Sequence, residues 1–202
     1  MKISQEEFWM GSFGDEYVKR NLTFSRVAQF SMILSKNNCK LQSILELGAN
    51  VGNNLDSIKV IYSNVETTGI EINQKACKIL RKKHQCFNKS IVDFNTNKKF
   101  DLVFTYGVLI HINPKFLKKI YSKMYKFSSK YILLSEYYNP TPIEVLYRDN
   151  QDKLFKRDFA KELWTQYPSL ELVDYGFFWK YDPIKPDDDW TWFLFKKQSK
   201  LK

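Results

Sequence analysis

The chain has 202 residues and a formal net charge of +10. That length suits a single domain with a complete core, and a content of 44% hydrophobic and 16% aromatic residues excludes an intrinsically disordered chain. No apolar run approaches the roughly 18 residues of a membrane span, and the N-terminus lacks the continuous apolar segment of a signal peptide, so we expect a cytoplasmic protein without a membrane partner.

The basic residues and the cysteines narrow the choice of partners. Lysines in residues 78–84 and 116–126 recur at helical spacing opposite apolar positions, which indicates solvated helix faces. Attraction of a small anionic substrate is a second use of this charge, and nucleic-acid binding is a third that we disfavour. Cys39, Cys77 and Cys86 have no CxxC or ligand-like spacing. We therefore expect no disulfide framework, no metal site and a reducing compartment.

The N-terminal region combines four aromatic residues with two glycines, which indicates short helical pieces and a lid-like turn. Residues 1–21 either cap the core or close over a ligand. Residues 23–37 follow as an amphipathic helix, because Phe24, Phe30 and Ile33 share one apolar stripe. Strands are predicted at 43–47, 67–72, 85–92, 101–105, 130–135, 170–179 and 190–195. Helices are predicted at 52–62, 74–84, 115–127 and 157–167, with Asn73 as the cap of the second and Pro114 at the start of the third.

The alternation of strands and helices predicts an α/β fold. We expect a three-layer αβα sandwich, in which a mainly parallel seven-stranded sheet ends in a C-terminal antiparallel hairpin. No linker divides the chain, so residues 1–202 form a single domain. Residues 137–157 are predicted as a substrate-side insertion that is irregular from residue 139.

The segment LELGANVGNNL, residues 45–55, places an acid and two glycines at the end of the first strand. In an open parallel sheet, ligands bind beyond the carboxyl ends of the strands. The turn has neither G-K-[ST] nor GxGxxG, so it does not match a phosphate cradle, and its carboxylate suits a cationic amino group. The candidate ligand-binding residues here are Glu46, Gly48, Asn50 and Gly52.

A second acid, Glu71, ends the second strand 19 residues beyond Gly52. A carboxylate in that place is suited to bridging the two hydroxyls of a ribose. A ribose together with an ammonium group, and without a phosphate, describes S-adenosylmethionine. The alternative is a tight strand-to-helix turn that holds no ligand.

The pattern E-x-G-x-x-x-G, followed by an acid at the end of the second strand, resembles the class I, Rossmann-like S-adenosylmethionine-dependent methyltransferases. The resemblance spans residues 40–136 and continues in SIVD (90–93) and FDLVFTYGVLIHI (100–112). It departs from the family where Asn50 replaces the usual second glycine. The resemblance implies an enzyme with that fold and cofactor, whose further cofactor-binding residues are Ile72, Ser90, Ile91, Asp93 and Tyr106.

A narrower resemblance covers nearly the whole chain. FWMGSFGDEYVKRN (8–21), SEYYNPTPIEVLYR (135–148) and KLFKRDFAKELW (153–164) are similar to segments of the pseudaminic acid biosynthesis-associated methylases. That resemblance implies methyl transfer to a nonulosonic acid sugar of the pseudaminic or legionaminic type, or to its nucleotide-activated form, in bacterial surface-glycan biosynthesis.

Methyl transfer from a sulfonium needs alignment, exclusion of water and often removal of one proton, so candidate bases are of interest. His111 has a suitable ordinary pKa, and Glu136 and Tyr138 lie at the end of the fifth predicted strand. An anionic sugar calls for guanidinium contacts. The candidate substrate-binding residues are Tyr137, Asn139, Arg148 and Arg157, and Tyr17, Arg20 and Asn21 could reach the methionine end of the cofactor.

Two other functions stay open. A nucleic-acid or protein methyltransferase would use the basic charge, although TYGV (105–108) stands where amino-methylating DNA enzymes commonly carry [DN]-P-P-[YF]. A cofactor-binding regulator without catalytic activity would also keep the motif. The sequence does not indicate an oligomeric state.

Overall fold

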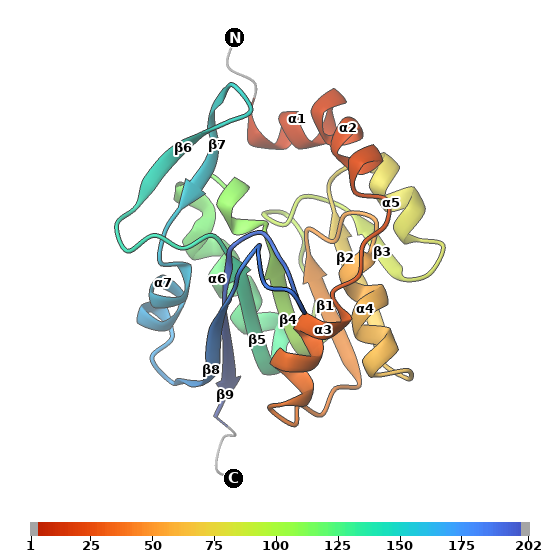
Figure 1. Cartoon of the computed structure of the whole chain (residues 1–202), viewed down its shortest axis with the longest axis vertical. Coiled ribbons are helices and arrows are strands. Elements are labelled where there is room, and N and C mark those ends of the chain that lie inside the picture. The colour runs from red at the N-terminus through yellow and green to blue at the C-terminus, as the bar shows by residue number, and fades with distance from the viewer. Residues whose placement is uncertain (1–3, 199–202) are drawn as a thin grey trace.

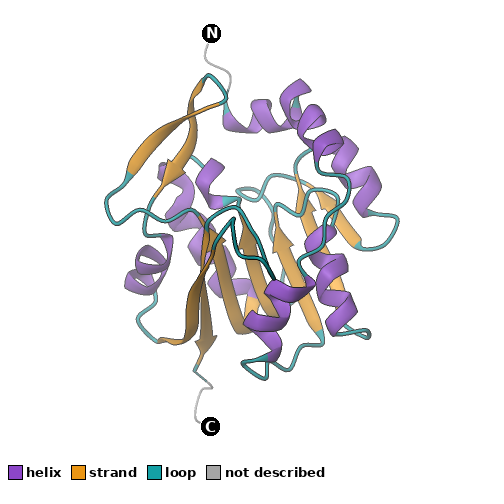
Figure 2. Ribbon diagram, in the orientation of Figure 1, coloured by secondary structure: helices purple, strands orange, loops and turns teal. Residues whose placement is uncertain are grey.

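The computed structural model describes residues 4–198. Seven strands form one sheet in the order β3-β2-β1-β4-β5-β9-β8, and helices lie on both of its faces (Figures 1 and 2). The strands are β1 (Ser43–Leu47), β2 (Glu66–Glu71), β3 (Gln85–Asn88), β4 (Phe100–Tyr106), β5 (Ser128–Glu136), β8 (Leu170–Phe178) and β9 (Trp190–Lys197). The larger helices are α2 (Ser12–Arg20), α4 (Asn53–Ile61), α5 (Gln74–Leu80), α6 (Leu117–Phe127) and α7 (Phe159–Gln166), with α1 (Gln5–Met10) and α3 (Val27–Phe30) shorter.

Strands β1 to β5 run parallel, β9 pairs antiparallel with β5, and β8 pairs antiparallel with β9. This arrangement confirms the predicted sheet with its C-terminal hairpin. Every residue of the central strand β4 is buried, which explains why five of its seven residues are apolar or aromatic. Since the parallel strands share one direction, their carboxyl ends all lie at the same edge of the sheet.

Two predicted helix starts are confirmed in detail. The side chain of Asn73 caps α5 by accepting hydrogen bonds from the backbone nitrogens of Lys75 and Ala76. Pro114 begins a short 3-10 turn, η3 (Pro114–Phe116), which leads into α6.

The amphipathic helix expected from residue 23 instead begins at Val27 and continues as a π-helical segment, η1 (Ser31–Ser35). Phe30 and Ile33 are buried as expected, but Phe24 lies outside the helix with 40% of its surface exposed. The backbone nitrogen of Arg26 donates to Ser57 Oγ, and its side chain pairs with Asp187. These two tertiary contacts hold the chain out of the helix before residue 27.

The segment predicted as irregular forms a second, two-stranded sheet. Strands β6 (Ile143–Tyr147) and β7 (Asn150–Lys156) make an antiparallel hairpin beside α1 (Figure 1). Arg148 and Asp149 form its two-residue turn, and both have positive φ, as a type I′ turn requires. The prediction is wrong here because this turn lacks the Asn-Gly or Asp-Gly signal that usually marks such hairpins.

The expectation of no disulfide is also wrong, since Cys77 and Cys86 form one. The chain passes from α5 into β3 within nine residues and brings the two Cα atoms to 6.3 Å. The cysteine argument for a reducing compartment therefore falls, and a cytoplasmic location stays a prediction. Over residues 4–198, no group of three or more His, Cys, Asp or Glu side chains could hold a metal, and no helix is long and apolar enough to cross a bilayer.

Candidate active site

A cavity of about 970 Å³ lies at the carboxyl ends of the parallel strands. Its floor is made by the segments that follow β1, β2, β3 and β4. Helices α1 and α2 and the β6–β7 hairpin lie over the same end of the sheet (Figure 1) and complete the lining. This is the place where an open parallel sheet holds its ligand.

Glu46 lies in β1 at this edge and is fully buried. Its Oε1 accepts a hydrogen bond of 2.7 Å from Asn54 Nδ2, and its Oε2 is buried without a partner. Burial raises the pKa of Glu46 to about 8, although the Asn54 hydrogen bond and the charge of Arg26 lower it. The site therefore contains a buried carboxyl group whose ionised form a cationic group would stabilise.

The turn after β1 brings bare backbone to the cavity. Gly48 has φ +78°, and a Cβ there would come within 2.6 Å of Val108 Cγ2. Asn50 adopts φ +48°, a left-handed conformation that asparagine tolerates better than most residues, which explains why it can replace a glycine. Gly52 is the N-cap residue before α4 and does not line the cavity, so its contribution is to the shape of the turn.

Glu71, at the end of β2, fastens two turns of the floor. Its carboxylate accepts hydrogen bonds of 2.7 Å from the backbone nitrogens of Asn50 and Asn73. Burial raises its pKa, and these hydrogen bonds lower it. The side chain lines the cavity next to Ile72, so the two acids predicted from the sequence lie at adjacent strand ends of one pocket.

Of the three cofactor-binding residues predicted in the segment after β3, two line the cavity. Ser90 and Ile91 line the cavity, and the hydroxyl of Ser90 donates to Glu6 of the N-terminal region. Asp93 is exposed to solvent and does not line the cavity. A helical turn over residues 90–94 directs it away from the pocket. We therefore withdraw Asp93 as a cofactor-binding residue.

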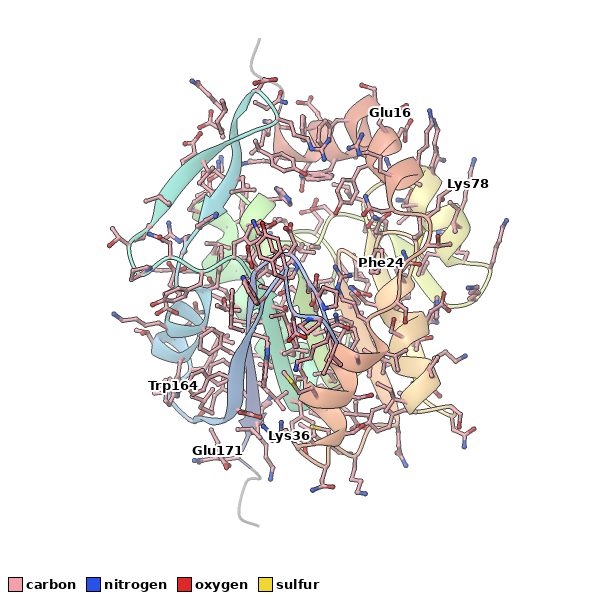
Figure 3. All side chains as sticks on the ribbon, viewed as in Figure 1. Glu16, Phe24, Lys36, Lys78, Trp164 and Glu171 are labelled. Atoms are coloured by element: carbon pink, nitrogen blue, oxygen red, sulfur yellow. A yellow bond between two sulfur atoms is a disulfide. The ribbon has the colours of Figure 1, made fainter. Side chains whose placement is uncertain are left out.

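Arg26 was missed by the sequence analysis, which chose Arg20 as the cation of this region. The Nε of Arg26 lies 2.8 Å from Asp187 Oδ2, and its Nη1 donates to Asn54 Oδ1 over 3.1 Å. Its guanidinium lies 4.3 Å from the ring centroid of Tyr106, whose hydroxyl also donates to Asp187. The importance of Arg26 becomes visible only from its pairing with Asp187, in the loop before β9. Figure 3 shows Phe24, whose ring the same guanidinium approaches to 4.2 Å, between the N-terminal helices and the sheet.

The predicted N-terminal residues Tyr17, Arg20 and Asn21 all line the cavity. The backbone oxygen of Asn21 accepts a hydrogen bond of 2.9 Å from Asn53 Nδ2, which joins the end of α2 to α4. Arg20 is largely exposed, so Arg26 is the more enclosed of the two cations.

His111 lies in a 3-10 turn, η2 (Leu109–His111), shortly after β4, and lines the cavity. Its Nδ1 is 2.7 Å from the backbone oxygen of Lys153 in β7. The rings of Trp9 and Tyr147 lie 4.7 Å and 4.9 Å from the imidazole. Burial lowers the pKa of His111 to about 4, so the ring is neutral at pH 7.

Glu136 has a structural position and not the catalytic one that the sequence suggested. It is 3% exposed and does not line the cavity. Its carboxylate accepts hydrogen bonds from the backbone nitrogens of Val108, Leu109 and Ile110 at 3.1–3.4 Å. Glu136 thus caps the turn that carries His111, and we withdraw it as a candidate base.

Three further candidates near the hairpin also lie outside the cavity lining. Tyr138 is 42% exposed, and the amide of Asn139 donates to the backbone oxygen of Thr141. Arg157 makes two contacts of 2.7 Å with Glu162 of α7. We withdraw all three. The chain leaves the cavity after Tyr137 and lines it again from Tyr147, so Tyr138 and Asn139 lie between these two parts of the lining.

The remaining wall of the cavity is aromatic and basic. Tyr137 and Trp190 are stacked at 4.2 Å between ring centroids, and the Tyr137 hydroxyl donates to Asp188. Arg148, at the hairpin turn, also lines the cavity. Two of the predicted substrate residues, Tyr137 and Arg148, therefore line one cavity, and Asp188 and Trp190 line it from the start of β9 and the loop before it.

Several cavity-lining side chains contain buried polar atoms without a partner. Such atoms are costly in a folded protein unless a ligand or water pairs with them. They comprise two acceptors and two indole N–H donors: Glu46 Oε2, Asn50 Oδ1, Trp9 Nε1 and Trp190 Nε1. A ligand of this pocket would therefore need both hydrogen-bond donors and hydrogen-bond acceptors to pair with these four atoms.

No family profile matches the chain, and no curated protein matches it in sequence. Solved structures match it in fold at low identity. A 1,6-didemethyltoxoflavin-N1-methyltransferase from Burkholderia thailandensis, with bound 1,6-didemethyltoxoflavin and S-adenosylhomocysteine, has a TM-score of 0.69 and 12% identity, over 96% of this chain and 87% of its own.

Two further structures cover nearly all of both chains. An S-adenosylmethionine-dependent methyltransferase from Clostridium acetobutylicum ATCC 824 has a TM-score of 0.64 and 12% identity, over 92% of this chain and 96% of its own. Magnesium protoporphyrin IX methyltransferase from Synechocystis PCC 6803, with bound S-adenosylmethionine, has a TM-score of 0.64 and 11% identity, over 97% and 98%. The chain therefore has the Rossmann-like methyltransferase fold.

Proposed function

We propose that the protein is an S-adenosylmethionine-dependent methyltransferase that acts on a small molecule. The observation that carries the proposal is the buried Oε2 of Glu46, which lacks a partner at the place where the fold holds a ligand. The ammonium group of the cofactor's amino acid end would donate to that atom and offset the burial of the carboxylate. The structural neighbours with bound S-adenosylmethionine or S-adenosylhomocysteine support the same cofactor.

The residues of the floor fit the parts of this cofactor in order. Glu46 takes the ammonium and Arg26 the carboxylate of the methionine end, while Glu71 accepts the ribose hydroxyls. Ile72 and Ile91 supply apolar contacts for the adenine, beside the hydroxyl of Ser90. When bound, the cofactor supplies a methyl group on a sulfonium, and the protein aligns the acceptor with it and excludes water.

The N-terminal region and the hairpin act as a cover in this proposal. Gln5 Nε2 of α1 donates to the backbone oxygen of Asp152 in β7 over 2.8 Å, so the two elements meet above the cavity. A covered pocket suits a small acceptor better than a nucleic-acid duplex. The charge pattern also favours this reading, because Lys78 lies at the outer edge of the molecule in Figure 3 and Lys36 pairs with Asp174 away from the cavity lining.

For the acceptor we propose an anionic sugar of the nonulosonic acid type, free or nucleotide-activated. Tyr137 and Trp190 give the cavity an aromatic wall, which suits packing against the C–H groups of a sugar ring. Arg148 supplies a guanidinium for a carboxylate, and the sequence resemblance to the pseudaminic acid-associated methylases agrees with this choice.

Calorimetric titration with S-adenosylhomocysteine and with ATP tests the cofactor. Binding of the first in the micromolar range without binding of the second supports the proposal, and the reverse contradicts it. Mass spectrometry of pseudaminic and legionaminic acids and their nucleotide-activated forms, incubated with enzyme and S-adenosylmethionine, then tests the acceptor by the gain of one methylene mass. Cofactor binding without methylation of any small-molecule acceptor would favour the regulator.

A further inference from the structure

The hydrogen bond between His111 and the hairpin determines which imidazole nitrogen carries the proton. Nδ1 of His111 lies 2.7 Å from the backbone oxygen of Lys153. A carbonyl oxygen can only accept a hydrogen bond, so Nδ1 of the neutral ring is the protonated nitrogen. Nε2 is then left with a free lone pair on a ring that lines the cavity.

The ring is fixed by residues from three separate parts of the chain. Trp9 of α1 and Tyr147 of β6 lie within 5 Å of it, and the carboxylate of Glu136 caps the turn on which it stands. Phe13 of α2 also contacts Tyr147 at 5.8 Å between ring centroids. His111 therefore has this environment only when the N-terminal helices and the hairpin are both in place.

We propose that His111 is the general base for methylation of a hydroxyl group, and that the β6–β7 hairpin makes its Nε2 the proton acceptor through the backbone oxygen of Lys153. This inference rests on the proposed function and specifies its acceptor chemistry. The acceptor oxygen gains the methyl group, the C–S bond of the donor breaks with its electron pair kept by sulfur, and the hydroxyl proton passes to Nε2. The imidazolium later releases that proton to water.

The electrostatics of the ring select a hydroxyl over an aliphatic amine. As the new C–O bond forms, the oxygen becomes cationic and strongly acidic, so even a weakly basic imidazole can take its proton. An alkylammonium, with a pKa near 10, would not pass its proton to a ring whose pKa burial lowers to about 4. Tyr147 of β6 is a titratable group in direct contact with the imidazole. The other charged and titratable groups that line the same cavity are Glu6, Tyr17, Arg20, Arg26, Glu46, Glu71, Tyr106, Lys115, Tyr137, Arg148, Asp152, Lys153 and Asp188.

The protonation of the ring can be read directly by nitrogen NMR of the protein with S-adenosylhomocysteine. The chain has two histidines, so a His84→Gln variant assigns the signals. We expect the Nδ1–H form of His111 at pH 7, and the usual Nε2–H form after residues 143–156 are replaced by a short glycine-serine loop. The Nε2–H form in the intact chain would overturn the inference, as would an unchanged spectrum after the replacement.

The catalytic role is tested with His111→Asn, whose amide nitrogen can still donate to the Lys153 oxygen but which lacks Nε2. With a nucleotide-activated nonulosonic acid as acceptor, kcat should fall about 10²- to 10⁴-fold while the acceptor KM and the affinity for S-adenosylhomocysteine stay within threefold. A kcat within threefold of wild type would overturn it.

Failure of the proposed function gives a different result. An intact chain that does not bind S-adenosylhomocysteine refutes the methyltransferase itself. An intact chain that binds it but does not turn over this acceptor refutes only the acceptor class, and the NMR result then decides the inference about His111. Trp9→Phe, which keeps a ring beside the imidazole, serves as the matched control and should retain the Nδ1–H form.

Discussion

Glu46 and Asn54 are joined by a hydrogen bond of 2.7 Å inside the protein, and this bond leaves the second oxygen of Glu46 buried and unpaired. The pair connects the end of β1 to the first turn of α4, so both elements hold the carboxylate in place. Glu46 also interacts electrostatically with Arg26 and Glu71, so substitutions at these positions test the proposed cofactor site.

Replacement of Glu46 by glutamine should weaken S-adenosylhomocysteine about tenfold to a hundredfold, because a charge-assisted hydrogen bond to the ammonium is worth about 1.5–3 kcal/mol. The affinity for 5′-methylthioadenosine, which lacks the amino acid moiety, should not change. Titration calorimetry with both compounds measures the difference. Glu66→Gln, at an exposed carboxylate that pairs with Lys98, is the control. Equal losses for the two ligands would remove the ammonium from this position.

The raised pKa of Glu46 predicts a pH dependence of folding. A carboxyl group with a pKa of 4.5 when unfolded and about 8 when folded binds more protons in the folded state between those values. The free energy of unfolding therefore decreases as pH rises from about 4.5 to 8. Urea unfolding of Glu46→Gln should show a stability gain over wild type that grows across this window. A constant difference between the two proteins would contradict the buried, raised carboxyl.

Removal of the Glu71 side chain should affect both stability and binding. Glu71→Ala leaves the backbone nitrogens of Asn50 and Asn73 without their acceptor, at a cost of about 2–4 kcal/mol in unfolding free energy. It should also erase the preference of the wild type for adenosine over 2′-deoxyadenosine. Competition against S-adenosylhomocysteine measures that preference. If the variant keeps it, Glu71 does not accept the ribose hydroxyls.

Gly48 should not tolerate a side chain, for two separable reasons. Its φ of +78° strains any L residue, and a Cβ would approach Val108 Cγ2 to 2.6 Å. Gly48→Ala should lose about 1–3 kcal/mol of unfolding free energy, and the double variant Gly48→Ala/Val108→Ala should recover the steric part when compared with Val108→Ala alone. Strictly additive losses in chemical denaturation would exclude the clash.

The depressed pKa of His111 predicts a loss of stability in acid. The unfolded chain takes up a proton near pH 6.5, whereas the partly buried ring of the folded chain resists protonation until about pH 4. The free energy of unfolding thus falls as pH drops from about 6.5 to 4. His111→Asn should reduce this decline by up to about 3 kcal/mol. An identical acid response in both proteins, followed by circular dichroism, would place the imidazole in water.

Periodicity and turn chemistry were enough to predict the sheet and the floor of the site. Buried apolar runs such as SILEL and FDLVFT specify central parallel strands because both faces of those strands are covered by helices. The glycines of the first turn and the acids that end the first two strands are local sequence features. They were sufficient to predict Glu46, Gly48 and Glu71 as candidate site residues. Strand ends also meet at one edge of a parallel sheet by geometry, so these residues could be grouped without a structure.

Contacts between distant segments were decided only by the tertiary structure. Arg26 and Asp187 are 161 positions apart, and no spacing rule links an arginine before one helix to a loop between two late strands. The sequence suggested Glu136 as a base because it ends a strand. Packing instead directs its carboxylate to the backbone of the turn that follows the neighbouring strand β4. The hairpin, the disulfide and the environment of His111 arise in the same way. Side-chain direction and long-range pairing depend on how the layers pack, and local sequence preferences carry too little energy to determine that packing.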